Sequence, residues 1–470
     1  MSLAARNISL RVWLMWRSSS SAAGYKVAIV PQPNWRDDLR DFRKFGAPRL
    51  FFGISPGAMD SMVNHYTAAR RKRSDDAYTP DGRAGMRPDY PTIVYSQILR
   101  RLFPDTPIVA GGIEASLRRL SHYDYWQDRL RPGILAECDA DILSYGMGEH
   151  TIAGHIGFTF MALLPVACHM ASPPSIALLC CSIWRKLAAW LLGCRRHSSY
   201  EASKGKFIAS RSKESIMQEV KQVAAMPDFK GYISDLGGPS ANMYAMGGRD
   251  KDICAKCRRP SCLHPKVCPN LDTDHSALLN VYHCADAVPG VRKSFVGSGV
   301  RYDLAMHPTG DRTVDSTNRR YCRELIADHV SGRLKVAPEH TSDAVLDIMR
   351  KPSFALFHDF KRLFDNVNHS HGLKQQLIPY FISSHPGCRE TDMAMLAAET
   401  KELNFHLEQV QDFTPTPMTV ATEIYYTGYH PYTLEKVYTA RSSQEKLAQR
   451  RYFFWYDRTY RLGRHRRLFR

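Results

Sequence analysis

Four cysteines lie within fifteen residues of one another, and they are the side chains best suited to chemistry in this sequence. They are Cys254, Cys257, Cys262 and Cys268, one third of the chain's 12 cysteines. Four thiolates at this spacing can hold a zinc ion or an iron–sulfur cluster. Two disulfides or four unrelated thiols are the alternatives, but the other cysteines are scattered and no secretory signal is recognised, which favours a metal. Pro260 and Pro265 favour an irregular loop rather than a helix.

The chain is strongly basic, with a formal net charge of +18. Residues 431–470 contain 11 Lys and Arg against three Asp and Glu, and they surround an aromatic run at 452–456. Basic and aromatic residues together can grip single-stranded RNA through phosphate contacts and stacking. The alternative, which we favour, is a helical extension with a buried aromatic face and a solvated basic one.

Two further stretches have unusual compositions. Residues 1–23 contain three arginines, four consecutive serines and no acid, which is typical of a mitochondrial transit peptide but equally of a disordered or mistranslated leader. Residues 158–194 are strongly apolar, yet prolines and the Arg185–Lys186 pair leave no run of about 18 apolar residues. We therefore expect no membrane span, no membrane partner and a cytoplasmic location.

The first third of the chain alternates between short apolar runs and helical stretches. Strands are predicted at 25–31, 49–55, 107–112 and 140–146, with a helix at 91–102. This alternation predicts an α/β domain with a doubly wound parallel sheet. Ligand contacts in such folds gather at the carboxyl ends of the strands, here near Gly53, Gly111, Gly112 and Glu114. The glycines alternatively serve only tight turns.

A second alternating series begins near residue 206. Strands are predicted at 231–235, 293–298, 333–337 and 375–382, and helices at 212–225, 274–287, 316–329, 341–350 and 390–405. Most of these strands end in small or polar residues. Polar groups repeated at strand ends are typical of the working rim of a full or partial β/α barrel.

Long motifs of this chain resemble the YgiQ-like family of radical SAM proteins. They occupy residues 31–43, 59–67, 111–118, 122–126, 210–216, 232–239, 335–340 and 411–417. The resemblance implies a cobalamin-binding-like α/β domain at 24–151 and a partial TIM-type radical SAM barrel at 204–430, followed by the basic aromatic extension at 431–470. It also implies a [4Fe-4S] cluster and S-adenosylmethionine as cofactors, reductive cleavage to a 5′-deoxyadenosyl radical, and an unknown substrate. The protein's share in such chemistry is to bind and orient these groups.

The resemblance also implies residues of the S-adenosylmethionine site. Gly237, Gly238 and Pro239 stand where related barrels place a Gly-Gly-Glu type motif near the methionine amine, although a strand-ending turn explains them equally well. Two further strands supply candidates for binding the cofactor's carboxylate and ribose hydroxyls. Ser298, Arg301 and Asp303 follow the first, and Lys335 and Glu339 flank the second. The last two form a structural ion pair in the alternative reading.

His340 and His385 are expected to be scaffold residues. The first domain lacks the Asp-x-His-x2-Gly signature of cobalamin ligation, so a cobalamin bound through histidine is not supported, and cobalamin binding itself is left open.

The sequence departs from the family at the cluster ligands. Family members carry C-x3-C-x2-C shortly before the segment equivalent to 205–208, but no such spacing occurs in the 470 residues. Cys180, Cys181 and Cys194 are nearby with unsuitable gaps. Residues 1–23 and 152–203 also lack family motifs, and our hypothesis is that a frame-shifted or wrongly spliced reading produced both. The neighbouring frames of the coding DNA test it.

The four-cysteine group matches the family's second cysteine cluster. With four protein ligands it would be a closed structural zinc site or an auxiliary iron–sulfur centre, not the site of radical generation. Two functions stay open. The first is a radical SAM iron–sulfur protein that is inactive as written, and the second is a non-catalytic metal-binding protein that binds RNA through its basic tail.

Overall fold

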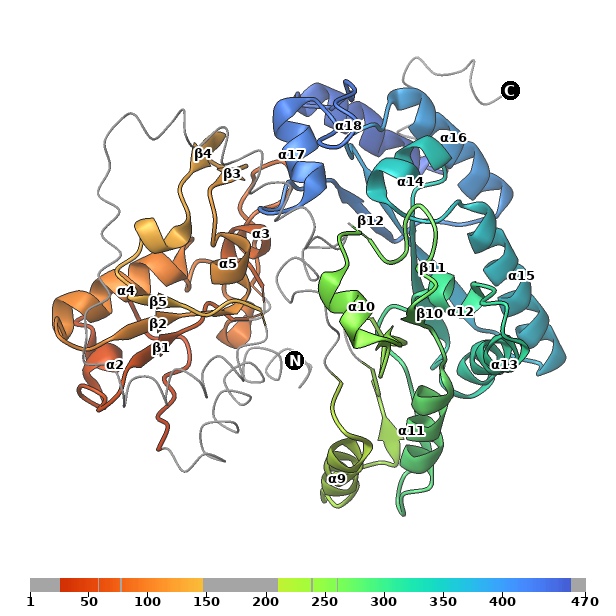
Figure 1. Cartoon of the computed structure of the whole chain (residues 1–470), viewed down its shortest axis with the longest axis horizontal. Coiled ribbons are helices and arrows are strands. Elements are labelled where there is room, and N and C mark those ends of the chain that lie inside the picture. Colours follow the sequence, from red (N-terminus) through yellow and green to blue (C-terminus); the bar gives the residue numbers. More distant parts are fainter. Residues whose placement is uncertain are drawn as a thin grey trace. The chain divides into compact units, whose positions relative to one another are not determined.

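The computed structural model describes residues 26–146 and 210–457, apart from residues 58, 77, 238, 239 and 260. Contacts divide the chain into two compact units (Figure 1): Met1–Lys206 with Thr414–Glu435, and Phe207–Phe413 with Lys436–Arg470. The α/β class is confirmed. The segments 1–23 and 152–203 lie outside the described residues. The predicted boundary at residue 431 falls inside Thr414–Glu435, which belongs to the first unit.

The first unit is built on a three-stranded parallel sheet in the order β1-β2-β5. Its strands are β1 (Phe52–Ile54), β2 (Ile108–Ala110) and β5 (Ile142–Leu143). The predicted helix at 91–102 is confirmed as α4 (Pro91–Leu102). Proline suits the first helical position, where its missing N–H costs nothing. Tyr95, Ile98 and Leu99 lie buried at helical spacing in the core that α4 forms with the sheet.

The remaining elements of the first unit are short. They are α2 (Arg40–Arg43), α3 (Ser61–His65), α5 (Gly112–Leu117), the antiparallel hairpin β3 (His122–Asp124) and β4 (Arg129–Arg131), two 3₁₀ turns (Pro80–Gly82 and Ile134–Ala136), and α17 (Val420–Thr427). The predicted strand at 25–31 is wrong for its described part. Residues 26–31 are mostly exposed and form no strand, because an apolar run needs a hydrogen-bonding partner as well as β propensity.

The second unit carries parallel strands that follow one another along the chain. They are β6 (Tyr232–Ile233), β9 (Lys293–Ser294), β10 (Arg333–Glu339), β11 (Gln376–Ser383) and β12 (Gln409–Asp412). β6 pairs with β9, and β11 lies between β10 and β12. A single bridge from Val300 to Val336 joins the loop after β9 to β10. The predicted strands of this half are therefore all present, and β12 is additional.

Helices separate these strands and supply the core. They are α9 (Lys213–Ala224), α10 (Lys251–Lys256), α11 (Ser276–Asp286), α12 (Tyr302–Met306), α13 (Arg312–Asp328), α14 (Asp343–Met349), α15 (Ala355–Ser370), α16 (Glu390–Glu402), α18 (Ser443–Arg451) and the 3₁₀ turn Tyr452–Phe454. Leu334 and Val336 of β10 are buried in the same core as Phe357 and Phe360 of α15. Alternate residues of β10 thus face this core, which leaves Lys335 on the other side of the strand. The pairing with β11 shifts register between Val336 and Glu339, so the alternation is interrupted before Glu339.

Two features bear on the partners that the sequence suggests. Tyr452 and Phe453 are 6% and 0% exposed and belong to the core of the second unit. These two rings of the aromatic run therefore cannot stack on RNA bases, and the interpretation as a buried aromatic face is correct for them. Among the helices of the described ranges, none combines the length and apolarity needed to cross a membrane.

Candidate functional site

Polar side chains of the second unit lie where its parallel strands end. Asp235 follows β6, and its carboxylate accepts hydrogen bonds from the Gly297 N–H at 3.0 Å and the Ser298 hydroxyl at 2.6 Å. A Cβ on Gly297 would lie 3.2 Å from the Ser234 carbonyl oxygen, so glycine allows this close approach of two loops. Asp235 therefore fixes the position of the predicted ligand residue Ser298. The sequence analysis missed Asp235 because it assigned this residue to the strand.

Arg301 is held by a neighbouring carboxylate. Its Nε and Nη2 lie 2.8 and 2.6 Å from the two carboxylate oxygens of Asp303. Burial would raise the pKa of Asp303, but the guanidinium outweighs burial and keeps that pKa below its ordinary value. The structure thus brings together two predicted site residues, Arg301 and Asp303. The planar guanidinium of Arg301 binds a carboxylate of the protein itself through two parallel hydrogen bonds.

The structure pairs Glu339 with a different lysine from the one that the sequence suggested. Lys351 Nζ lies 2.7 Å from a Glu339 carboxylate oxygen, whereas Lys335 is exposed on β10. The structural ion pair predicted between Lys335 and Glu339 is therefore wrong, because Glu339 pairs with Lys351 instead. Lys351 was not predicted because it lies beyond α14, and only residues near the ends of predicted strands were considered.

The ends of β10 and β11 share a rare backbone conformation. Glu339 and Ser384 have φ values of 68° and 60°, the left-handed region that side chains other than glycine rarely adopt. Such strain costs about 1 to 3 kcal/mol at each residue and is common at functional sites. Both residues precede a buried histidine, so the two adjacent strands end in the same way.

His340 and His385 are buried scaffold residues. The Ser342 N–H donates to His340 Nδ1 at 3.0 Å, and His385 Nδ1 donates to the Pro386 carbonyl at 2.8 Å. The Cys388 sulfur lies 3.5 Å from His340 Nε2. Burial lowers the pKa of each histidine to about 4 and raises the pKa of the Cys388 thiol to about 12. These groups are neutral near pH 7 and serve structure rather than proton transfer.

The two histidines predict a loss of stability in mild acid. Their folded-state pKa lies below the ordinary 6.5, so the unfolded chain binds the extra protons. Stability is therefore complete above pH 6.5 and falls between pH 6.5 and 4, by about 2 kcal/mol for each histidine at pH 5. Urea unfolding at several pH values measures this. His340→Asn should flatten the dependence, whereas His369→Asn, at an exposed position, should leave it as it is. An unchanged slope in His340→Asn contradicts the prediction.

The four-cysteine loop closes on a short antiparallel pair. β7 (Gly247–Gly248) pairs with β8 (Leu271–Asp272) at its base. Cys254 lies in α10 (Lys251–Lys256), so the prediction of an irregular loop is wrong for residues 254–256 of the run. The Asp250 side chain caps this helix, and both prolines of the run come only after it ends. Asn270 Nδ2 donates to the Cys254 sulfur at 3.2 Å. An N–H donor of this kind stabilises a thiolate.

All four thiols of this loop are half-buried, and none of the described cysteines is disulfide-bonded. His264 Nε2 lies 2.8 Å from an Asp347 carboxylate oxygen, which ties the loop to α14. Within the described ranges, no three Cys, His, Asp or Glu side chains are gathered closely enough to form a metal site. The structure therefore places four candidate ligands in one loop without bringing them to coordination distance.

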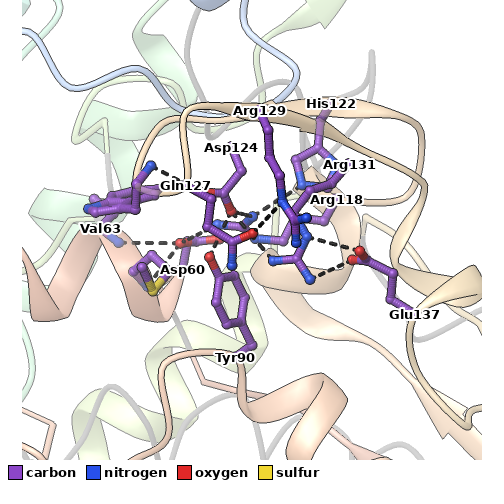
Figure 2. A network of polar contacts seen from close by, with 12 residues as sticks. Asp60, Val63, Tyr90, Arg118, His122, Asp124, Gln127, Arg129, Arg131 and Glu137 are labelled. Carbon is purple, nitrogen blue, oxygen red and sulfur yellow. Dashed lines mark hydrogen bonds and ion pairs between the residues drawn. The ribbon is translucent and has the colours of Figure 1, made fainter.

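A buried polar network occupies the first unit (Figure 2). Arg118 is 1% exposed and lies at its centre. Its guanidinium donates to Asp60 at 2.9 and 3.2 Å and to Asp124 at 3.0 Å, and it contacts His122 Nε2 at 3.1 Å. The Tyr90 hydroxyl donates to the same Asp124 carboxylate at 2.8 Å. The network joins α3 to α5 and the β3–β4 hairpin, which lie far from α3 in sequence.

Glu114 lies beside this network and is fully buried. One carboxylate oxygen accepts the Thr92 N–H at 3.1 Å. Burial, followed by the charge of Asp60, raises the pKa of Glu114 to about 7. Gly112, at the start of α5, has φ of 85°, and a Cβ there would lie 2.6 Å from the Ser55 hydroxyl oxygen. The tight turn and this close contact are therefore enough to explain why residue 112 is glycine, without a role in ligand binding. Sequence reasoning missed the network, although charged residues inside apolar motifs at 59–67 and 111–126 were a usable signal.

The donor set for a radical-generating cluster does not fit this chain. C-x3-C-x2-C is absent from the full sequence, and no cluster of three metal-ligating side chains occurs within the described ranges. Cys180, Cys181 and Cys194, with the neighbouring positions where the triad would fall, lie outside the described residues, as do Gly238 and Pro239. Gly237 is described, and a Cβ there would lie 3.0 Å from an Asp235 carboxylate oxygen.

Two family models and several proteins of known sequence match this chain. A family model described as Radical SAM N-terminal matches residues 15–161, and one described as a domain of unknown function (DUF3362) matches residues 408–464. A UPF0313 protein of Bacteroides thetaiotaomicron is 51% identical over 542 residues, which cover 93% of this chain and 87% of that protein. A UPF0313 protein of Methanocella arvoryzae is 36% identical, covering 91% and 85%.

Among solved structures, the chain is similar to the radical S-adenosylmethionine methyltransferase TsrM from Kitasatospora setae, determined with cobalamin and a [4Fe-4S] cluster bound. The sequence identity is 12% and the TM-score 0.47, with 90% of this chain and 75% of that chain covered. The aligned span of 542 residues with the Bacteroides protein exceeds the 470 residues of this chain. That relative therefore contains residues, inside the aligned span, that have no counterpart here.

Proposed function

The chain belongs to the YgiQ-like radical SAM family, and from this membership we propose that its second unit is a partial radical SAM barrel that binds S-adenosylmethionine at the carboxyl ends of its strands. One observation carries the proposal. Asp235 and Ser298 follow the parallel strands β6 and β9, Glu339 is the last residue of β10, and hydrogen bonds or ion pairs hold each in place. Ligands of α/β folds bind at such strand ends.

The chemistry of these side chains suits this cofactor. S-adenosylmethionine presents an ammonium group and ribose hydroxyls, which carboxylates such as Asp235 and Glu339 accept as hydrogen-bond donors. Its carboxylate needs a cation, and Arg301, whose guanidinium is held in place by Asp303, is the candidate. The strain at Glu339 is explained if it aims this carboxylate at the ligand. Gly237, Gly238, Pro239 and Lys335 stay candidate contacts by resemblance.

Cleavage of the cofactor is a separate matter, because the cluster ligands are missing. We propose that the chain as written binds S-adenosylmethionine and does not cleave it. The residues absent relative to the Bacteroides protein agree with a coding sequence that has lost the cluster-binding segment near 152–203. The substrate of an intact relative stays unidentified.

The remaining domain assignments are proposed on the same basis. The first unit, with its three parallel strands, would correspond to the cobalamin-binding-like domain of the family, with cobalamin binding itself open. The four-cysteine loop would be a closed structural zinc site or an auxiliary iron–sulfur centre. The half-buried thiols and the hydrogen bond from Asn270 to Cys254 support the assignment of the four-cysteine loop as a site for a metal or a cluster.

Equilibrium binding tests the proposed rim. We expect isothermal titration of the purified chain with S-adenosylmethionine to show one saturable site. Glu339→Gln should weaken binding at least about tenfold, the loss of one charge-assisted hydrogen bond. Glu324→Gln removes the same charge from α13, where Glu324 pairs with Arg320 and His283 and with none of the proposed rim residues, and it should bind like the parent. Absence of binding, or equal losses in both variants, would contradict the proposal.

A further inference from the structure

A basic run and a group of exposed tyrosines meet on the first unit, and neither has a role in binding S-adenosylmethionine. The run is Arg70, Arg71, Lys72 and Arg73, four consecutive cations whose side chains are all exposed. Backbone hydrogen bonds fix it as a tight turn, since the Thr67 N–H donates to the Arg71 carbonyl and the Arg73 N–H to the His65 carbonyl, both at 2.8 Å. The turn therefore presents concentrated positive charge from a defined backbone.

Ring contacts connect this basic turn to the tyrosines of α17. The Arg70 guanidinium lies 4.5 Å from the centre of the Tyr125 ring. That ring is 5.9 Å from Tyr425, and Tyr123 of β3 is 4.8 Å from Tyr426, centre to centre. Thr414–Glu435 belongs to the first unit, and the buried rings of Tyr125 and Tyr425 hold the basic turn and α17 beside each other. The exposed side chains of the two segments are taken together as one surface.

This surface exposes aromatic rings as well as charge. Tyr426, Tyr429 and Tyr432 are 42%, 50% and 39% exposed and lie within seven residues. Gly428 ends α17 with φ of 77°, which turns the chain and places the last two on the loop that follows. Exposed tyrosines beside exposed arginines are the combination with which proteins hold single-stranded nucleic acid, through stacked bases and phosphate contacts.

We propose that the basic turn 70–73 and the tyrosines 426, 429 and 432 bind single-stranded nucleic acid. Charge alone would also suit an acidic protein, but three exposed rings supply flat faces that bases need and acidic peptides do not. The carboxyl-terminal aromatic run is a poorer platform, because Tyr452 and Phe453 are buried. Nucleic acid would therefore bind to this surface of the first unit rather than to the carboxyl-terminal tail.

Fluorescence anisotropy of the full chain with a labelled oligouridine tests the proposal. The variant Arg71→Ala, Lys72→Ala, Arg73→Ala should bind about tenfold more weakly at low salt, and the slope of log affinity against log salt should fall by about two, at about 0.7 for each phosphate contact. Arg70 is left intact because it packs on Tyr125. Tyr426→Ala with Tyr429→Ala should weaken binding by at least about fivefold for each stacked base, whereas the matching pair of Phe variants should bind like the parent.

Matched controls separate this surface from general basicity. Arg312→Ala, Arg319→Ala, Arg323→Ala removes three exposed charges from α13 in the second unit. Arg464→Ala, Arg466→Ala, Arg467→Ala removes three arginines from the carboxyl-terminal tail. Both should retain most of the affinity, and melting temperatures show whether every variant is folded. The proposal is overturned if the tail variant accounts for the loss, if the Phe pair is as weak as the Ala pair, or if duplex RNA or polyglutamate competes as well as oligouridine.

Discussion

Anaerobic reconstitution of this chain with iron and sulfide, followed by reduction with S-adenosylmethionine, should yield no 5′-deoxyadenosine above the protein-free background. A chimera in which residues 152–203 are replaced by the corresponding segment of the Bacteroides thetaiotaomicron relative should yield it. The reason is chemical. Reductive cleavage needs an iron–sulfur cluster with one iron left open, and this chain has no C-x3-C-x2-C to hold it. The expected difference in product is at least about a hundredfold, because cofactor chemistry lies with the cofactor and not with the protein.

The four-cysteine loop provides the internal control for this experiment. Any metal that the unaltered chain retains should depend on Cys254 and Cys268, so that changing either to serine lowers the zinc or iron content. Cys284→Ser, at a half-buried cysteine of α11, should leave the content unchanged. Product formation by the unaltered chain would refute the prediction. A chimera that binds four irons and still forms no product would show that the loss extends beyond the missing segment.

The elements of the fold were most predictable where local and tertiary signals agree. The helix at 91–102 begins with a proline and buries one face, and it matches α4 to the residue. The strands at 333–337 and 375–382 are apolar runs that both find parallel partners. Residues 26–31 have the same apolar character but no partner, and no strand forms. α15 was missed, although Phe357, Phe360 and Phe364 recur at helical spacing along it.

The candidate site was less predictable, because side-chain partners are set by tertiary contacts. The ends of the predicted strands indicated Ser298, Arg301 and Glu339 as ligand-binding residues, and this stays a prediction. The sequence did not identify Asp235 and Lys351 as the partners of Ser298 and Glu339, since these pairs depend on how separate segments meet. It also did not pair Arg301 with Asp303, although the two residues are near neighbours in the chain. The same limit hid the network around Arg118, whose carboxylate partners lie 58 and six residues away.

Replacing Arg118 should destabilise the first unit more than any surface change. Arg118→Met keeps a side chain of similar length but leaves Asp60 a buried carboxylate without its cation, and leaves Asp124 with Arg131 alone, at 3.6 Å. Burial would raise the pKa of Asp124, and the Arg118 charge at present holds that pKa below its ordinary value. Breaking a buried ion pair on one side costs about 3 to 5 kcal/mol. We expect the free energy of unfolding of the first unit, measured by urea denaturation, to fall by that amount.

Two further variants distinguish the charge effect from simple loss of packing. Arg129→Met, on the exposed side of β4, should change stability by no more than about 0.5 kcal/mol. Adding Asp60→Asn and Asp124→Asn to Arg118→Met removes the uncompensated charges, and an asparagine in place of Asp60 can still cap α3, so stability should partly return. If the triple variant is less stable than Arg118→Met, packing around the guanidinium and not its charge holds α3, α5 and the β3–β4 hairpin together. A shift below about 1 kcal/mol in Arg118→Met would mean that water reaches this network and screens it, because only solvated ion pairs contribute so little.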